Sequence, residues 1–270
     1  MEKSPTPRPA ASTRIAYMKP KRRIWVVSYL YGQAQRLVSI HHAIAQEYQA
    51  GDQIVYLGNY LGRNPTGAEA LDELLYFRRA LMATAGTQAD DVVYLKGRQE
   101  EHWRRLLQLH LERDPRRAYA EMVGDGLAEA IASYGKDPEI VPAILADGSA
   151  AFAKWVAELL DTQKKREGHY QLLTEHLLYA ALLPGATAIV SAGVDPALPL
   201  EDQRDEFWAR RQEPISGWTQ TGVLVHGECP GMPFGVSLGE GGIITVNGGS
   251  DGLAALLLDE SAMPVRIIEI

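Results

Sequence analysis

Three successive units occupy residues 24–97, each with a short apolar run that ends near a glycine, and they constrain the fold more than any other feature. The apolar runs are residues 24–27, 53–57 and 91–95. The segments 35–48 and 67–83 that separate them carry Leu and Ile at helical spacing. Strands that alternate with helices are typical of βαβ units, in which the strands lie parallel. We therefore predict a parallel sheet that begins with these three strands.

The pattern changes after residue 98, where long helical stretches are broken by prolines. We predict helices at 100–112, 119–134, 148–160 and 169–182, which together form a helical cap inserted at about residues 99–183. Strands are predicted to resume at 188–190, 222–225, 242–246, 254–258 and 265–268. The later of these strands have short, glycine-rich connections, which favour antiparallel pairing in a second sheet. The expected fold class is α/β, a sandwich of two sheets flanked by helices.

The composition of the chain argues against two classes of function, nucleic-acid binding and membrane insertion. The chain has 270 residues, of which 46% are apolar and 23% charged, as in ordinary globular proteins. Its net charge of -7 argues against nucleic-acid binding, which needs a basic surface. No apolar run reaches membrane-spanning length, so we expect no membrane insertion. The single cysteine, Cys229, allows no internal disulfide and favours a reducing compartment, and we expect a cytoplasmic protein.

Residues 1–23 are rich in Pro, Ser, Lys and Arg and lack the apolar segment of a secretory signal. We predict that they form a disordered basic tail, and that residues 24–270 form a single domain. Such a tail is suited to docking on an acidic partner.

The segments that follow the predicted strands resemble, in order and approximate spacing, the motifs of the calcineurin-like metallophosphoesterases, and in particular the bacterial serine/threonine phosphatase branch. The family's Gly-Asp-x-His-Gly corresponds to Ser28-Tyr29-Leu30-Tyr31-Gly32, and Gly-Asp-Tyr-x-Asp-Arg-Gly corresponds to Gly58-Asn59-Tyr60-Leu61-Gly62-Arg63-Asn64. Gly-Asn-His-Glu corresponds to Gly97-Arg98-Gln99-Glu100, His-Ala-Gly to Ser191-Ala192-Gly193, and Gly-His-Thr-x-Pro to Gly227-Glu228-Cys229-Pro230. The resemblance extends to about residue 258 and implies a metallophosphoesterase fold.

The resemblance also implies that the catalytic chemistry has been lost. Such enzymes hold two divalent metals, such as Mn or Fe, with anionic and imidazole ligands. The corresponding positions here are Tyr29, Tyr31, Asn59, Arg98, Ser191 and Glu228, with Gln99 in place of the protonating histidine. Only Glu228 is a conventional ligand, and Arg98 brings a permanent positive charge. We therefore expect no catalytic residues, no metal and no cofactor.

Two interpretations of the remaining charges stay open. In one, Arg98 pairs with Glu228 and plugs the former metal site together with Tyr29 and Tyr31. In the other, Arg98, Arg63 and Arg210 form an anion-binding pocket. Arg63 matches the family's phosphate-contacting arginine.

The leading hypothesis is a pseudophosphatase that acts by binding another protein, as a scaffold or assembly subunit. One alternative is a phosphoesterase with a rearranged metal site that uses His226, Glu228, Glu100 or His102. The other is a sensor of a phosphorylated ligand.

Overall fold

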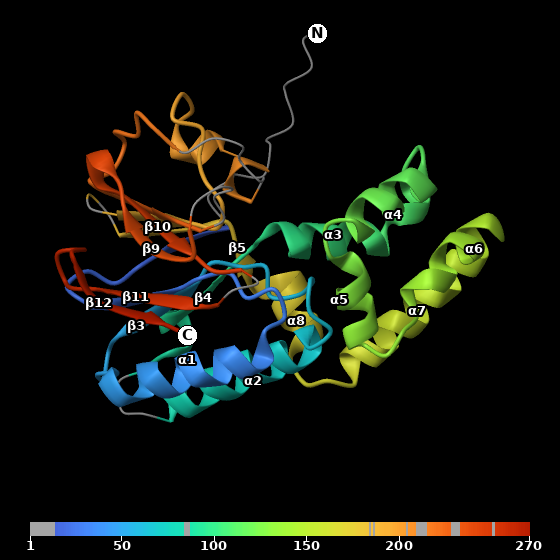
Figure 1. Cartoon of the computed structure of the whole chain (residues 1–270), viewed down its shortest axis with the longest axis horizontal. Coiled ribbons are helices and arrows are strands. Elements are labelled where there is room, and N and C mark those ends of the chain that lie inside the picture. The colour runs from blue at the N-terminus through green and yellow to red at the C-terminus, as the bar shows by residue number, and fades with distance from the viewer. Residues whose placement is uncertain are drawn as a thin grey trace, which may run out of the picture.

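The computed structural model describes residues 14–83, 87–183, 185, 187–203, 205–208, 215–227, 233–249 and 252–270. Two six-stranded sheets pack face to face, and helices cover the outer face of one of them (Figure 1). The predicted α/β sandwich is confirmed.

The first sheet has the strand order β12-β11-β2-β3-β4-β5. Strands β2 to β5 run parallel, which confirms the parallel arrangement predicted for residues 24–95, and β11 runs antiparallel to both β2 and β12. The strands are β2 (Ile24–Val27), β3 (Gln53–Tyr56), β4 (Val92–Leu95), β5 (Leu177–Leu178), β11 (Ala254–Leu258) and β12 (Pro264–Glu269).

The second sheet has the order β1-β6-β7-β8-β10-β9. Its strands are β1 (Ile15–Tyr17), β6 (Ala180–Leu183), β7 (Thr187–Val190), β8 (Val223–His226), β9 (Gly235–Leu238) and β10 (Ile243–Asn247). The antiparallel pairing predicted for the later strands holds for β9 with β10 and for β11 with β12, but β8 pairs parallel with both β7 and β10. Strands β11 and β12 were predicted in the second sheet, but they belong to the first sheet, where they extend its edge beyond β2.

Helices α1 and α2 pack against the first sheet, and α3 to α7 extend to one side of the sandwich (Figure 1). The helices are α1 (Ala34–Glu47), α2 (Gly67–Met82), α3 (Arg98–Leu107), α4 (Pro115–Val123), α5 (Leu127–Ser133), α6 (Val141–Ala146), α7 (Ser149–Lys164) and α8 (His169–Gln171). The helix predicted at 119–134 is interrupted at Gly126, whose φ of 108° is left-handed. The helix predicted at 169–182 gives way to strands from Leu177 onward.

Successive side chains of each strand point to opposite faces of the sheet, so the core is divided into separate clusters. Trp25 and Val27 face the helices, whereas Ile24 and Val26 face the second sheet, and all four side chains are fully buried. A third cluster covers the outer face of the second sheet with loop side chains such as Phe207 and Trp218. Both faces of the central strands are therefore dry, which explains their continuous apolar runs.

The N-terminal segment differs from the prediction. Residues 1–13 lie outside the described part of the chain, but Ile15–Tyr17 form β1 parallel to β6, and Met18 is buried between the sheets. A disordered tail to residue 23 is therefore wrong from residue 15 onward, because the apolar residues of this short strand extend the second sheet. None of the described helices has both the length and the apolar character needed to cross a membrane.

Candidate functional site

The loops that leave β2, β3 and β4 meet at one end of the first sheet, because the carboxyl ends of parallel strands share an edge. The backbone N–H groups of Tyr31 and Gly32 donate to the carbonyls of Asn59 and Tyr60, so the loops after β2 and β3 stay paired beyond the strands. A β-carbon on Gly97 would lie 2.5 Å from Asn59 Oδ1, so the loop after β4 approaches closely only with glycine there.

The backbone of this site is unusual. Tyr31, Asn59 and Arg63 have φ values of 45°, 50° and 56°, and they are three of the five described non-glycine residues with positive φ. Left-handed conformations cost about 1 kcal/mol or more for such side chains and collect at functional sites. The loops at the strand ends therefore hold a strained backbone at three side chains of this site.

Tyr29 and Tyr31 lie in the loop that leaves β2, and both side chains are buried. The Tyr29 hydroxyl donates a hydrogen bond to Asn247 Oδ1 on β10. The two rings meet edge to face with centroids 5.0 Å apart, and the Arg63 guanidinium lies 4.1 Å from the centre of the Tyr31 ring. The Tyr29 phenol oxygen therefore does not stand as a free ligand.

Asn59 and Glu100 act as backbone caps. Asn59 Oδ1 accepts a hydrogen bond from the Gln99 N–H, and the Glu100 carboxylate accepts bonds from the N–H groups of Asn59, Tyr60 and Gly97 at 2.8–2.9 Å. Burial raises the pKa of Glu100, while these backbone hydrogen bonds act in the opposite direction. The hydrogen bonds of both side chains join the loop after β3 to the start of α3.

Asp125 is the centre of the charged part of the site, although it lies in none of the sequence motifs. Its carboxylate accepts from Arg63 Nη2 at 3.0 Å and from Arg98 Nε at 2.5 Å. Its backbone carbonyl accepts from Gln99 Nε2 at 2.6 Å, and the neighbouring Gly126 carbonyl accepts from the Arg63 N–H. The turn between α4 and α5 is therefore clamped onto the loops after β3 and β4.

His102 lies behind this cluster. Its Nδ1 is 3.8 Å from Asp125 Oδ2, too far for a hydrogen bond, and has no hydrogen-bond partner among the described residues. Burial lowers the pKa of His102 to about 4, with Asp125 opposing and Arg98 reinforcing that shift. At neutral pH the imidazole is uncharged.

Three further residues were predicted at the site, and the structure describes only one of them, Ser191. Ser191 follows β7 directly and is buried, and its carbonyl accepts from the Gly227 N–H at 2.8 Å. Glu228 and Arg210 lie outside the described residues. The predicted pairing of Arg98 with Glu228 therefore stays a prediction, whereas the pairing of Arg98 with Asp125 is observed.

The described side chains do not fit two divalent metals. Within the described ranges, no group of three or more His, Cys, Asp or Glu residues is placed to hold a metal ion. Of the oxygens at the family's ligand positions, Asn59 Oδ1 already accepts an N–H, and Arg98 adds positive charge beside them. His226, part of the rearranged-site alternative, is bonded through Nδ1 to the Ala192 carbonyl and through Nε2 to Thr245.

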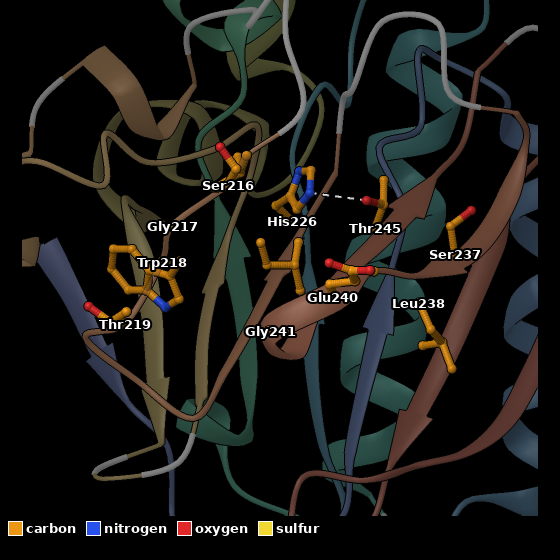
Figure 2. A pocket seen from close by; sticks show the side chains of 13 residues that line it. Ser216, Gly217, Trp218, Thr219, His226, Ser237, Leu238, Glu240, Gly241 and Thr245 are labelled. Atoms are coloured by element: carbon orange, nitrogen blue, oxygen red, sulfur yellow. Dashed lines mark hydrogen bonds between the residues drawn. The ribbon is translucent and has the colours of Figure 1, made fainter.

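A cavity of about 600 Å³ lies on the outer face of the second sheet, at the opposite side of β8 and β10 from the sandwich core (Figure 2). Because a carbonyl only accepts, His226 carries its proton on Nδ1, and the Thr245 hydroxyl donates to Nε2. Glu240 lies across the cavity from the buried Trp218. No sequence motif marks this cavity, because its walls combine residues 215–219 and 239–241 with side chains of β8, β9 and β10 that are far apart in the chain.

Comparison with known proteins identifies the fold. No protein-family model and no curated protein matches this sequence. Among solved structures, a protein assigned as a diadenosine tetraphosphatase is 13% identical with a TM-score of 0.52, covering 95% of this chain and 97% of its own. A serine/threonine phosphatase from Saccharomyces cerevisiae is also 13% identical, with a TM-score of 0.51 and coverage of 96% and 82%. The chain therefore has the metallophosphoesterase fold, as its strand-end motifs predict.

Proposed function

We propose that this chain is a catalytically inactive member of the metallophosphoesterase fold that acts by binding another protein, as a scaffold or assembly subunit. The observation that carries the proposal is the Asp125 carboxylate, which bridges Arg63 and Arg98 at the strand ends where a metallophosphoesterase holds its metals. Among the described residues, both guanidinium groups at this site already bind a carboxylate of the same chain, and no group suited to hydrolysis stands beside them.

Electrostatics supports this interpretation. Two divalent cations need several anionic ligands, one of them shared between the metals. Apart from Glu100, which caps backbone N–H groups, the described part of the site offers one carboxylate, Asp125, and two guanidinium groups already neutralise it. A cation placed beside Arg98 would meet a charge that cannot be titrated away at neutral pH.

The sensor of a phosphorylated ligand is the second candidate, and one observation favours it. Arg63 and Arg98 come from different loops yet converge on one carboxylate, and each side chain is more than a third exposed. A phosphate group carries the same kind of oxygens as the Asp125 carboxylate. On this alternative a ligand would have to displace Asp125.

Hydrolysis of an aryl phosphate in the presence of manganese tests the proposal. A positive control is a chain in which the implied ligands are restored, with Tyr29→Asp, Tyr31→His, Asn59→Asp, Arg98→Asn, Gln99→His, Ser191→His and Glu228→His. We expect no metal-dependent turnover by the natural chain. Turnover that depends on manganese and survives Arg98→Ala would overturn the proposal and favour the rearranged metal site.

A further inference from the structure

The cavity of about 600 Å³ on the outer face of the second sheet has a row of polar side chains on its floor (Figure 2). Residues that pair across neighbouring strands turn their side chains to the same face of a sheet. Thr245 on β10 pairs with His226 on β8 and with Ser237 on β9, so these three side chains form a row across three strands. The next residue in the row, Val190 on β7, already belongs to the apolar cluster on this face.

The direction of the hydrogen bonds in this row determines what it offers to a ligand. His226 Nδ1 donates to the Ala192 carbonyl at 3.1 Å, and the Thr245 hydroxyl donates to His226 Nε2 at 3.0 Å. Because the proton of the Thr245 hydroxyl is already used, its oxygen can only accept a further hydrogen bond. A ligand that binds this oxygen must therefore supply an N–H or O–H group.

Glu240 adds a negative charge to the cavity. It begins the turn Glu240–Gly242 between β9 and β10 and lies across the cavity from Trp218 (Figure 2). A β-carbon on Gly242 would lie 2.3 Å from the Gly222 carbonyl oxygen, so the turn packs closely on the residue before β8. Within the described part of the chain, the Glu240 carboxylate forms no ion pair or hydrogen bond. This carboxylate is therefore available to a ligand.

Apolar and aromatic side chains complete the cavity. Ile215 and Trp218 belong to the cluster on the outer face of the second sheet, and Ile243 packs against that cluster. The Trp218 indole N–H donates to the Thr221 hydroxyl at 2.9 Å, so the indole offers the cavity ring carbons and no donor. The electron-rich face of an indole attracts cations, as the carboxylate of Glu240 does.

We propose that this cavity binds a small organic ammonium ion with an apolar body. Glu240 holds the ammonium charge, the Thr245 oxygen accepts an N–H or O–H group, and the body packs against Trp218, Ile215 and Ile243. The volume falls in the range of about 300–1,000 Å³ that is typical of small-molecule sites. An anionic ligand of the same shape would be repelled by Glu240, and a neutral one would leave this carboxylate unpaired.

The proposal is independent of whether the strand-end site is inactive. The cavity lies on the opposite face of β8 and β10 from the core between the sheets, and none of its described lining residues is one of the family's metal-ligand positions.

Isothermal titration calorimetry with three probes of similar shape and different charge tests the proposal. Phenethylamine is a cation at neutral pH, phenethyl alcohol is neutral and phenylacetate is an anion. We expect saturable binding of phenethylamine at millimolar concentrations, and binding that is roughly fivefold weaker or less for the other two probes. If phenethylamine does not bind, or if either of the other probes binds as tightly, the proposal is wrong.

Substitutions of Glu240 show whether the amine binds in this cavity. Glu240 is exposed, so Glu240→Gln and Glu240→Lys should both fold like the wild type. Glu240→Gln should weaken phenethylamine binding by roughly 3- to 10-fold. Glu240→Lys should abolish it and allow phenylacetate to bind instead. Glu260→Gln, at an exposed glutamate between β11 and β12, is the matched control and should bind phenethylamine like the wild type.

Amide hydrogen exchange provides a second readout. Exchange in the turn Glu240–Gly242 should slow when phenethylamine binds to the wild type, and should not change when it is added to Glu240→Lys. Amine binding that both Glu240 variants leave unchanged, or that slows exchange only in other parts of the chain, would overturn the proposal.

Discussion

Asp125 joins side chains from two strand-end loops to a turn of the helical cap. Its carboxylate bridges Arg63 and Arg98, and its side chain is only 13% exposed. Gln99 donates to its backbone carbonyl, so the same residue is held by main chain and side chain together. The Asp125 carboxylate occupies the position between the two arginines that a bound anion would take in an open pocket.

Replacing Asp125 by Asn should unmask whatever anion affinity the two arginines have. We expect a loss of roughly 1 kcal/mol in the free energy of unfolding, because the ion pairs are partly exposed. Inorganic phosphate should then raise the unfolding temperature of the variant more than that of the wild type. Glu121→Gln, which breaks the exposed Arg117–Glu121 pair, is the matched control. If phosphate stabilises the wild type as strongly as the variant, Asp125 does not occupy the site.

The pKa of His102, lowered to about 4 by burial, makes a prediction about acid stability. Between its unfolded value of 6.5 and about 4, the unfolded chain binds a proton that the folded chain does not. The stability that depends on neutral His102 is therefore complete above pH 6.5 and is lost as the pH falls toward 4.

Urea unfolding at two pH values measures this effect. The wild type should lose about 1–2 kcal/mol more than His102→Asn between pH 7 and about pH 4.5. His41 and His169, whose pKa values are also lowered by burial, contribute equally in both proteins and cancel in the comparison. The exposed His42→Asn is the control. An identical pH dependence in wild type and His102→Asn would contradict the burial of a neutral imidazole.

At the scale of elements, β1 shows how a short strand escapes sequence analysis. Its three residues follow a basic, proline-rich stretch and precede another basic run, so composition favours disorder. In the fold, the strand completes the second sheet beside β6, and the Met18 N–H donates to the Leu182 carbonyl at 2.8 Å. Strand β6 was predicted as part of a helix for a related reason. Its Ala and Leu residues continue the helical pattern of the preceding segment, and only their pairing with β1 and β7 makes them a strand.

Truncating Met18 tests whether β1 is part of the core. Met18 is 3% exposed between the sheets, so Met18→Ala should lower the free energy of unfolding by about 2–3 kcal/mol. Met82→Ala, at a residue 43% exposed at the end of α2, should change it by less than about 0.5 kcal/mol. Equal effects of the two substitutions in urea unfolding would mean that the N-terminal strand is not packed in solution.

For the molecule as a whole, the sequence predicted the sandwich and the parallel strands β2 to β4, because their apolar runs and glycine turns are local signals. The assignment of β11 and β12 to a second sheet failed, because periodicity does not say which sheet a strand joins. The structure brings Tyr29, Tyr31, Asn59, Arg63, Arg98 and Gln99 together at the strand ends.

Asp125 could not be found in this way. It lies in no motif, and its only local signal is a pair of flanking glycines that break a helix. Its partners are 62 and 27 residues away in the chain, so the contact exists only once the cap has folded onto the sheet. Tertiary placement, rather than sequence pattern, determines the charge balance of the site.

The number of manganese ions bound per chain tests whether the strand-end site holds metals. Purified protein would be incubated with manganese, desalted and analysed by mass spectrometry, with the ligand-restored variant as the positive control. We expect no stoichiometric metal in the natural chain, because Arg63 and Arg98 already bind the Asp125 carboxylate and leave an excess of positive charge. Close to two manganese ions per natural chain would contradict it, and would mean that a metal site forms despite these arginines.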